Sequence, residues 1–187
     1  FRRVLFRSHV IRIARGFGMK VLVFDLKQDS FWAEVLGFEY AAMDELLSRS
    51  DIITLHAPYN KHTHHLINPG NIGKIKRGAI LINTARGGLV DTDALLKALD
   101  EGILAGAGLD VLEGEEAVLE ESALLGDKTN PELLRRAIQN HVILKKPNVV
   151  FTPHNAFNSL EALQRILDTT AGNIAAFAAG KPQNVVK

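Results

Sequence analysis

The stretch AILINTARGGLVDTDALLKALDEGILAGAGLD, residues 79–110, decides the fold class of this chain. Short apolar runs at 79–83 and 105–110 enclose a helical pattern at 91–101. Asp91 stands where a helix N-cap is expected, and Gly102 stands where a glycine commonly ends a helix. A strand, a helix and a second strand in this order are the unit from which parallel sheets are built. The stretch therefore predicts an α/β fold with a parallel sheet.

The same alternation continues on both sides of this stretch. Further strand-like runs lie at 20–24, 51–55 and 149–152, and helical patterns at 9–16, 44–49, 71–75, 131–145 and 159–179. The strand-like runs are apolar on both faces, as expected when helices cover both sides of a sheet. We therefore expect a Rossmann-like, doubly wound parallel sheet. The acidic segment 113–126 breaks the alternation and is predicted to be a long excursion.

Composition narrows the possible partners and compartments. A chain of 187 residues with 47% hydrophobic residues can bury one sizeable core. A formal net charge of +1 argues against a nucleic-acid partner. The longest apolar runs are far shorter than a membrane span, and the N-terminal segment lacks the apolar run of a signal peptide. The absence of cysteine excludes disulfides, so we expect a cytoplasmic protein.

Several strings, in a fixed order, resemble the D-2-hydroxyacid dehydrogenases. They are residues 9–25, 51–58, 63–68, 81–91, 108–111 and 152–157, so the resemblance covers nearly everything after residue 8. It implies an NAD-dependent enzyme that moves a hydride between the cofactor NAD and a small 2-hydroxy or 2-keto acid. It also implies a homodimer, because this family pairs through its nucleotide-binding domains.

The first residues depart from the family pattern. A G-x-G-x-x-G fingerprint is expected just before the helix containing His9, but its glycine positions hold Arg2, Val4 and Arg7. These side chains cannot make the tight turn or allow close approach of the backbone to a pyrophosphate. Residues 1–8 resemble the translation of a sequencing-adapter end, and a natural basic arm is the alternative. We expect this polypeptide to bind NAD poorly or not at all.

The domain organisation follows from this departure. We expect residues 1–8 to be a non-native segment that forms no strand, so that the first strand and the glycine fingerprint of the fold are missing. Residues 9–154 are expected to be an incomplete NAD-binding domain. Residues 155–187 are predicted to return, through a final helix, toward a substrate domain that is largely absent from the chain.

Three residues are candidates for the chemistry. Arg86 follows an apolar strand, at the carboxyl end where open α/β sheets bind ligands, and its guanidinium can hold a carboxylate with two hydrogen bonds. Gly87 and Gly88 are expected to leave open space around it. The resemblance makes His154 the acid/base for the substrate oxygen, a role that suits an imidazole. It makes Glu115 the partner that raises the pKa of this histidine, with Glu113 and Glu116 as alternative registers.

Other residues are candidates for cofactor binding. Asp25 ends a predicted strand, where a carboxylate can bind both adenosine-ribose hydroxyls and favour NAD over NADP, although it could equally cap a turn. The nearby positive charge of Lys27 weakens the preference for NAD over NADP. The resemblance places further residues around the nicotinamide or in the loop beside it, with ordinary loop structure as the alternative: Ala57, Pro58, Thr63, Thr84, Ala85, Arg86 and Asp110. His62, His64 and His65 do not have the spacing of a metal site, and none is predicted.

The residues that follow His154 indicate the class of substrate. His154 is followed by Asn155, Ala156 and Phe157, which resembles the D-lactate branch more than the phosphoglycerate branch. The bulky Phe157 then suggests a small apolar substrate such as pyruvate. Two other hypotheses remain: an NAD-sensing corepressor module of the C-terminal-binding-protein type, and an inactive fragment.

Overall fold

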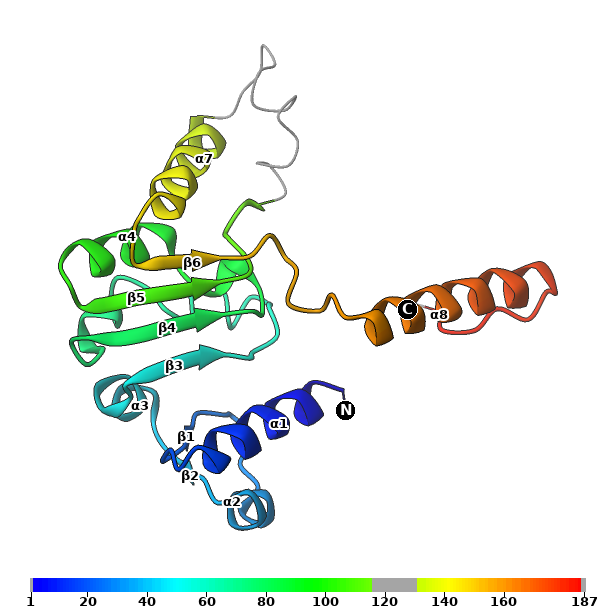
Figure 1. Ribbon diagram of the computed structural model, residues 1–187, viewed down its shortest axis with the longest axis horizontal. Helices are drawn as coiled ribbons and strands as arrows, with labels where there is room; N and C mark the ends of the chain where they lie inside the picture. Colours follow the sequence, from blue (N-terminus) through cyan, green and yellow to red (C-terminus); the bar gives the residue numbers. More distant parts are fainter. Residues whose placement is uncertain (1, 116–130, 186–187) are drawn as a thin grey trace. The chain divides into compact units, whose positions relative to one another are not determined.

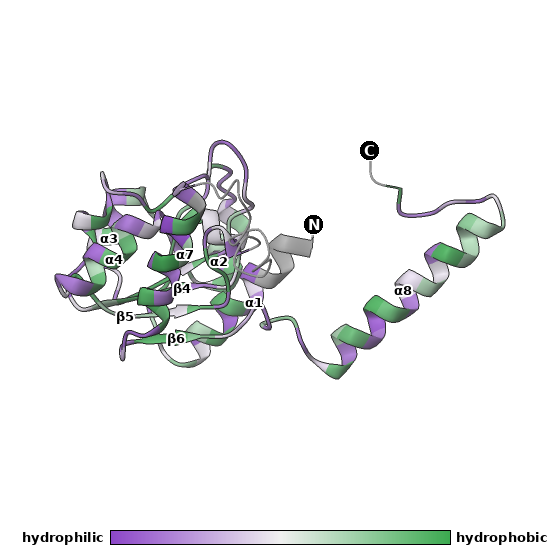
Figure 2. Cartoon of the chain, turned by 90° about the horizontal axis from the view of Figure 1, so that it is seen from above, coloured by the Kyte–Doolittle hydropathy of each residue, from purple (hydrophilic) through white to green (hydrophobic). Residues whose placement is uncertain are grey.

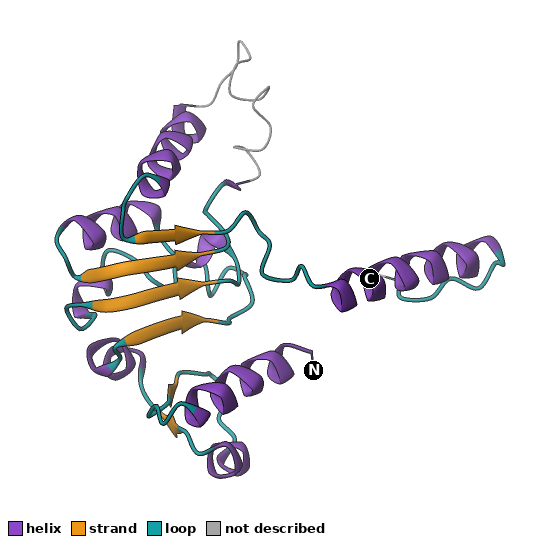
Figure 3. Cartoon of the chain, viewed as in Figure 1, coloured by secondary structure: helices purple, strands orange, loops and turns teal. Residues whose placement is uncertain are grey.

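The computed structural model of the chain describes residues 2–115 and 131–185. The chain divides into two compact units, Phe1–Pro153 and His154–Lys187. The first contains both sheets and most of the helices, and the second is built around one long helix (Figures 1 and 3).

The larger sheet of the first unit has four parallel strands in the order β3-β4-β5-β6. These are β3 (Ile52–Leu55), β4 (Ala79–Asn83), β5 (Leu104–Leu109) and β6 (Val149–Phe151). All four were predicted within one residue or so of their bounds. Because the strands are parallel, their carboxyl ends lie along one edge, and the loops that follow them meet there (Figure 1).

A second sheet contains only β1 (Leu22–Val23) and β2 (Glu39–Tyr40), which pair in parallel. The predicted strand 20–24 is therefore shortened to two residues, and β2 was not predicted. In a doubly wound sheet of order 3-2-1-4-5-6, the first strand separates the second from the fourth. Among the described residues no strand fills this place between β1 and β3, which accounts for the two separate sheets.

One face of the four-stranded sheet carries the core. Four elements pack on this face: α3 (Met43–Arg49), the 3-10 helix η1 (Ile72–Lys74), α4 (Thr92–Asp100) and α7 (Pro131–Leu144). Their apolar side chains form one cluster with those of the strands, including the fully buried Leu47, Leu81, Ala98, Leu104 and Ile143. The prediction of helix 71–75 was wrong in type, since only a single 3-10 turn forms there.

Within the described part of the first unit, apolar side chains on the opposite face of this sheet are partly exposed. Ile52, Ile80 and Val150 are 44%, 41% and 71% exposed, although their apolar character suggested helices on both sides. The side chains of a strand alternate between the faces, so these residues point away from the face that α3, α4 and α7 cover.

Two helices accompany the small sheet. The first, α1 (Arg2–Gly16), begins at Arg2 rather than at residue 9 as predicted, so residues 2–8 form no strand and that prediction is confirmed. The second, α2 (Ser30–Leu36), was not predicted, although both of its ends carry local signals. The Asp29 side chain accepts hydrogen bonds from the first-turn amides, and Gly37 adopts a left-handed φ of 68°.

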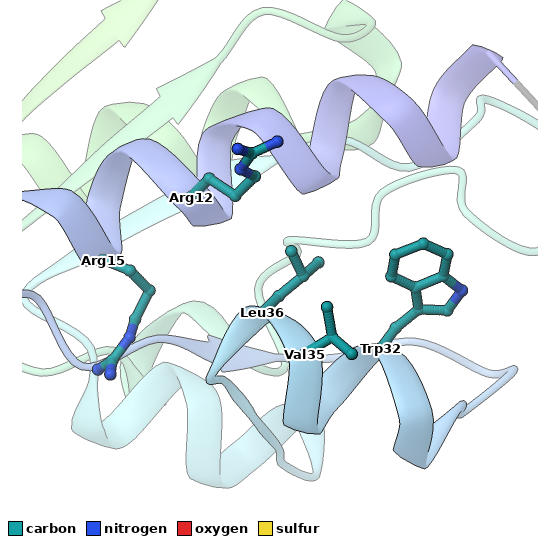
Figure 4. Close-up of a pocket in the computed structure, with 5 residues that line it drawn as sticks. All are labelled: Arg12, Arg15, Trp32, Val35 and Leu36. Atoms are coloured by element: carbon teal, nitrogen blue, oxygen red, sulfur yellow. The ribbon is translucent and has the colours of Figure 1, made fainter.

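A shallow pocket lies between α1 and α2. It is lined by Arg12, Arg15, Trp32, Val35 and Leu36 (Figure 4). None of these residues belongs to the predicted site.

The ends of α4 agree with the sequence pattern. The Asp91 carboxylate accepts a hydrogen bond from the Ala94 amide at 2.8 Å, and Gly102 has a φ of 64°. The predictions that Asp91 caps this helix and that Gly102 ends it are both confirmed. Each depends on residues close together in the chain.

The second unit is dominated by α8 (Leu160–Ala178), as predicted. The Ser159 hydroxyl caps it by accepting from the Ala162 amide at 3.2 Å. Hydrophobic and hydrophilic residues alternate around the helix, and its apolar stripe is exposed in this unit (Figure 2). Across the described parts of the chain, no helix has both the length and the apolar character of a membrane span.

Candidate functional site

Arg86 lies at the carboxyl end of β4, as predicted, and a buried amide fixes its backbone. Asn83, the last residue of β4, is 1% exposed. Its Nδ2 donates to the Arg86 carbonyl at 2.9 Å, and its Oδ1 accepts from the Ala85 amide at 3.1 Å. The Arg86 side chain is exposed and donates to the Ala85 carbonyl at 2.6 Å. Asn83 was not predicted as a site residue, although a polar residue closing an apolar strand is a usable signal.

The two glycines after Arg86 are needed for close packing. A Cβ on Gly87 would lie 2.0 Å from the Leu112 carbonyl oxygen, and one on Gly88 would lie 2.6 Å from the Tyr59 ring. The expectation that they leave open space around Arg86 was therefore wrong. They allow the loops after β3 and β5 to close on either side of the loop that carries Arg86.

The predicted nicotinamide-side residues follow β3, β4 and β5 and share the carboxyl edge of the sheet. Asp110 is 3% exposed; its carboxylate accepts from the Thr152 hydroxyl, which ties the end of β5 to the end of β6. Thr63 closes the loop from Pro58 by accepting from the Asn60 amide at 2.9 Å and donating to the Pro58 carbonyl. The sheet thus brings these candidates to one edge: Ala57, Pro58, Thr63, Thr84, Ala85, Arg86 and Asp110.

The three candidate glutamates have different environments. Glu115 is half-buried, and its Oε2 accepts from the Leu112 amide at 3.0 Å within the same turn. Glu113 is 15% exposed and is held by His65, Thr92 and Arg136. Glu116 lies outside the described residues. Glu113 is therefore held by contacts within its own unit, and the choice between the registers stays a prediction.

The histidines of the 60–68 loop do not converge on a common point. His65 pairs with Glu113 at 2.7 Å, and the His64 Nδ1 and Tyr59 hydroxyl are 3.0 Å apart. The rings of His64 and His65 stack at 3.7 Å. His65 was considered only as a metal ligand, and its pairing with a glutamate 48 residues later had no local sequence signal.

His154 is the first residue of the second unit. Its backbone φ of 49° places it in the left-handed region, which a non-glycine residue rarely adopts. Arg86 and Glu115 belong to the first unit, so a joint site with His154 stays a prediction.

Asp25 is the residue predicted to bind the adenosine end of the cofactor. This residue follows β1, as predicted, but its carboxylate is already occupied: it accepts from the Lys27 amide at 3.0 Å and forms an ion pair with Arg7. Burial and, next, the charge of Arg7 lower the pKa of His56, beside Ala57.

Residues 2–7 do not fit a dinucleotide. The helix α1 runs through all three positions at which the fingerprint needs glycine, so no glycine turn faces a pyrophosphate. The residues from position 8 onward are compatible with the cofactor, because the doubly wound fold binds dinucleotides beyond the carboxyl ends of its strands, where the loops after β3, β4 and β5 lie.

Comparison with known proteins agrees with this geometry. Residues 8–156 match the NAD-binding domain of the D-isomer specific 2-hydroxyacid dehydrogenases, and residues 1–7 lie outside the match. A D-specific alpha-keto acid dehydrogenase of Enterococcus faecium is 42% identical over 171 residues, which are 90% of this chain and 48% of that protein. A glyoxylate reductase of Korarchaeum cryptofilum is 40% identical, covering 95% of this chain and 48% of its own length.

A solved structure shows the same fold. D-lactate dehydrogenase from Aquifex aeolicus, complexed with NAD and lactic acid, superposes with a TM-score of 0.81 at 41% identity, covering 93% of this chain and 50% of that one. The chain spans about half the length of the relatives it matches. It belongs to the D-isomer specific 2-hydroxyacid dehydrogenase family, and its residues 8–156 correspond to the family's NAD-binding domain.

Proposed function

We propose that this chain is the nucleotide-binding part of an NAD-dependent dehydrogenase that interconverts small D-2-hydroxy acids and 2-keto acids of the lactate and pyruvate kind. The observation that carries the proposal is the presentation of Arg86. Its backbone is fixed by the buried Asn83, and its guanidinium is exposed at the carboxyl edge of the sheet. A rigid guanidinium in this place can bind a substrate carboxylate through two parallel hydrogen bonds.

The remaining chemistry is assigned to two residues. His154 donates a proton to the carbonyl oxygen of the 2-keto acid as the carbonyl carbon is reduced, and it removes that proton in the reverse direction. Glu115 is assigned as the partner that orients this imidazole. NAD, when bound, supplies or accepts the hydride.

We propose that the chain binds NAD weakly because of its residues 1–7. Arg7 pairs with Asp25, the carboxylate that should receive the ribose hydroxyls, and α1 replaces the glycine turn. Replacing residues 1–7 by the first strand and fingerprint of the Aquifex relative should strengthen NADH binding, as measured by fluorescence titration. Equal affinity before and after the replacement would show that Arg7 and α1 do not obstruct the site.

The activity is tested in a chimera. Residues 8–187 replace the matching segment of the Aquifex aeolicus D-lactate dehydrogenase, which keeps its own fingerprint and its other half. The chimera should oxidise NADH with pyruvate, and the unaltered Aquifex enzyme is the control. A folded chimera that binds NADH and does not reduce pyruvate, glyoxylate or larger 2-keto acids would contradict the proposal and favour an NAD-sensing role.

A further inference from the structure

The loops after β3, β4 and β5 are joined at a single carboxylate, that of Glu113. Its Oε1 is 2.7 Å from the Nε2 of His65, in the loop after β3. Its Oε2 accepts from the Thr92 hydroxyl at 2.7 Å, at the start of α4, and from Arg136 of α7 at 2.5 Å. Three separate segments of the first unit therefore contact this side chain.

The environment of Glu113 favours its ionised form. Burial by itself raises the pKa of the Glu113 carboxyl, but hydrogen bonds from His65 and Thr92 and the charge of Arg136 lower it by more. The net pKa is below the ordinary value of a glutamate. The carboxylate is therefore charged at neutral pH, and its hydrogen bonds are of the stronger, charge-assisted kind.

His65 is held from more than one side. Its backbone amide donates to the Gly88 carbonyl at 2.9 Å, and its Nδ1 lies 3.4 Å from the Asp91 carboxylate. Its φ of 50° is unusual for a residue with a side chain. The surrounding structure thus maintains a strained backbone conformation that directs the imidazole at Glu113.

The backbone of Glu113 is part of the turn that contains Glu115. Asn140 of α7 donates to the Glu113 carbonyl at 3.0 Å, and the Leu112 amide donates to Glu115 Oε2 at 3.0 Å. The Leu112 carbonyl in turn lies against Gly87, next to Arg86. A shift of Glu113 would therefore move both Glu115 and the wall of the loop that carries Arg86.

We propose that Glu113 is a positioning residue: through His65, Thr92 and Arg136 it holds the turn 112–115 so that Glu115 keeps its place beside the loop of Arg86. The kinetic consequence rests on the proposed function, because that function gives Glu115 its role. The structural consequence can be measured without any activity.

The structural test is amide hydrogen exchange on the whole chain. The Leu112 amide donates to the Glu115 carboxylate and therefore reports on the position of that side chain. In Glu113→Gln this amide should exchange about tenfold faster, because weakening one charge-assisted hydrogen bond changes the local opening equilibrium by about that factor. The amides of β4 should keep their rates. His65→Asn, with a residue that tolerates positive φ, should act in the same direction.

Asp93→Asn is the matched control. It removes the Arg135–Asp93 ion pair (2.9 Å), which also joins α7 to α4 but lies outside the turn 112–115. This variant should leave the Leu112 amide unchanged. An unchanged Leu112 amide in Glu113→Gln, or equal acceleration of β4 and Leu112, would overturn the proposal.

The kinetic test uses the chimera described above. Glu113→Gln should lower kcat about tenfold with little change in the KM for pyruvate, and it should lower kcat no further when Glu115→Gln is already present. Full additivity of the two substitutions would overturn the kinetic part of the proposal. An inactive parent chimera would instead contradict the proposed function, while the exchange experiment would still decide whether Glu113 positions the turn.

Discussion

At the residue scale, the buried Asn83 holds the backbone of the loop that presents the exposed Arg86 side chain. Asn83 has no access to solvent, and its amide group satisfies two backbone groups of the loop that carries Arg86. A buried amide is costly unless it is hydrogen-bonded, so the same bonds that satisfy Asn83 also fix the loop. The guanidinium itself remains exposed, as the proposed role of Arg86 requires.

Substitution of Arg86 by lysine in the chimera should raise the KM for pyruvate and lower kcat. Lysine retains the charge but cannot offer the two parallel N–H groups that a guanidinium presents to a carboxylate. Steady-state kinetics of pyruvate reduction, with NADH binding measured separately, check this. Unchanged kinetics in Arg86→Lys would exclude Arg86 as the carboxylate anchor.

Replacing Glu115 by glutamine in the chimera should lower kcat for pyruvate reduction and leave NADH binding unchanged. The resemblance makes this carboxylate the partner of the imidazole that handles the substrate proton, and glutamine keeps the size of the side chain but not its charge. Steady-state kinetics of the chimera with and without the substitution, with NADH binding measured separately, check this. An unchanged kcat would mean that His154 has another partner, with Glu116 as the next candidate.

At the scale of elements, the cluster around Glu113 links α4 and α7, two helices that are far apart in the sequence. It joins the start of α4 and the side of α7 to the loops after β3 and β5. The Arg135–Asp93 pair also joins these two helices, but both of its side chains are about half exposed. Exposed pairs contribute little, so the less exposed Glu113 carboxylate is expected to contribute more to the coupling between α4 and α7.

The pKa of Glu113 predicts how stability depends on pH. Because this pKa is lowered on folding, the stabilisation is present above the pKa of the unfolded chain and is lost as pH falls through the pKa of the folded chain. The wild type and Glu113→Gln should therefore differ most in free energy of unfolding near neutral pH. The difference should shrink between about pH 6 and about pH 3.

Urea unfolding of the wild type and of Glu113→Gln, near neutral pH and at about pH 3, measures this difference in free energy of unfolding. Asp93→Asn is the control. A difference that grows as the pH falls would contradict the ionised, paired state of Glu113.

For the whole molecule, we predict that the full dehydrogenase associates as a dimer or larger. The resemblance implies pairing through nucleotide-binding domains, and both units leave apolar residues exposed, among them Ile52, Ile80, Leu160 and Phe177. Exposed apolar groups of this size favour burial in an interface. Sedimentation velocity of the chimera at micromolar concentration tests the prediction, and a monomer there would contradict it.

Local patterns in the sequence were enough for most elements. The four strands of the larger sheet, the cap at Asp91, the glycine at Gly102 and the helix α8 all follow from residues within a few positions of each other. Two short elements, α2 and β2, were missed because seven and two residues give little periodicity to detect. The family, and with it the residue types of the site, could also be inferred from the motifs.

Only the tertiary structure decided how the loops meet. His65 and Glu113 are separated by 48 residues, and the packing of Gly87 on Leu112 joins two loops from neighbouring strands. No local pattern encodes such contacts, because they arise when parallel pairing brings the carboxyl ends of β3, β4 and β5 to one edge. The sequence by itself determined the four strands of the larger sheet, most of the longer helices and the family of this protein. The tertiary structure decided that Glu113 is partly buried between His65, Thr92 and Arg136.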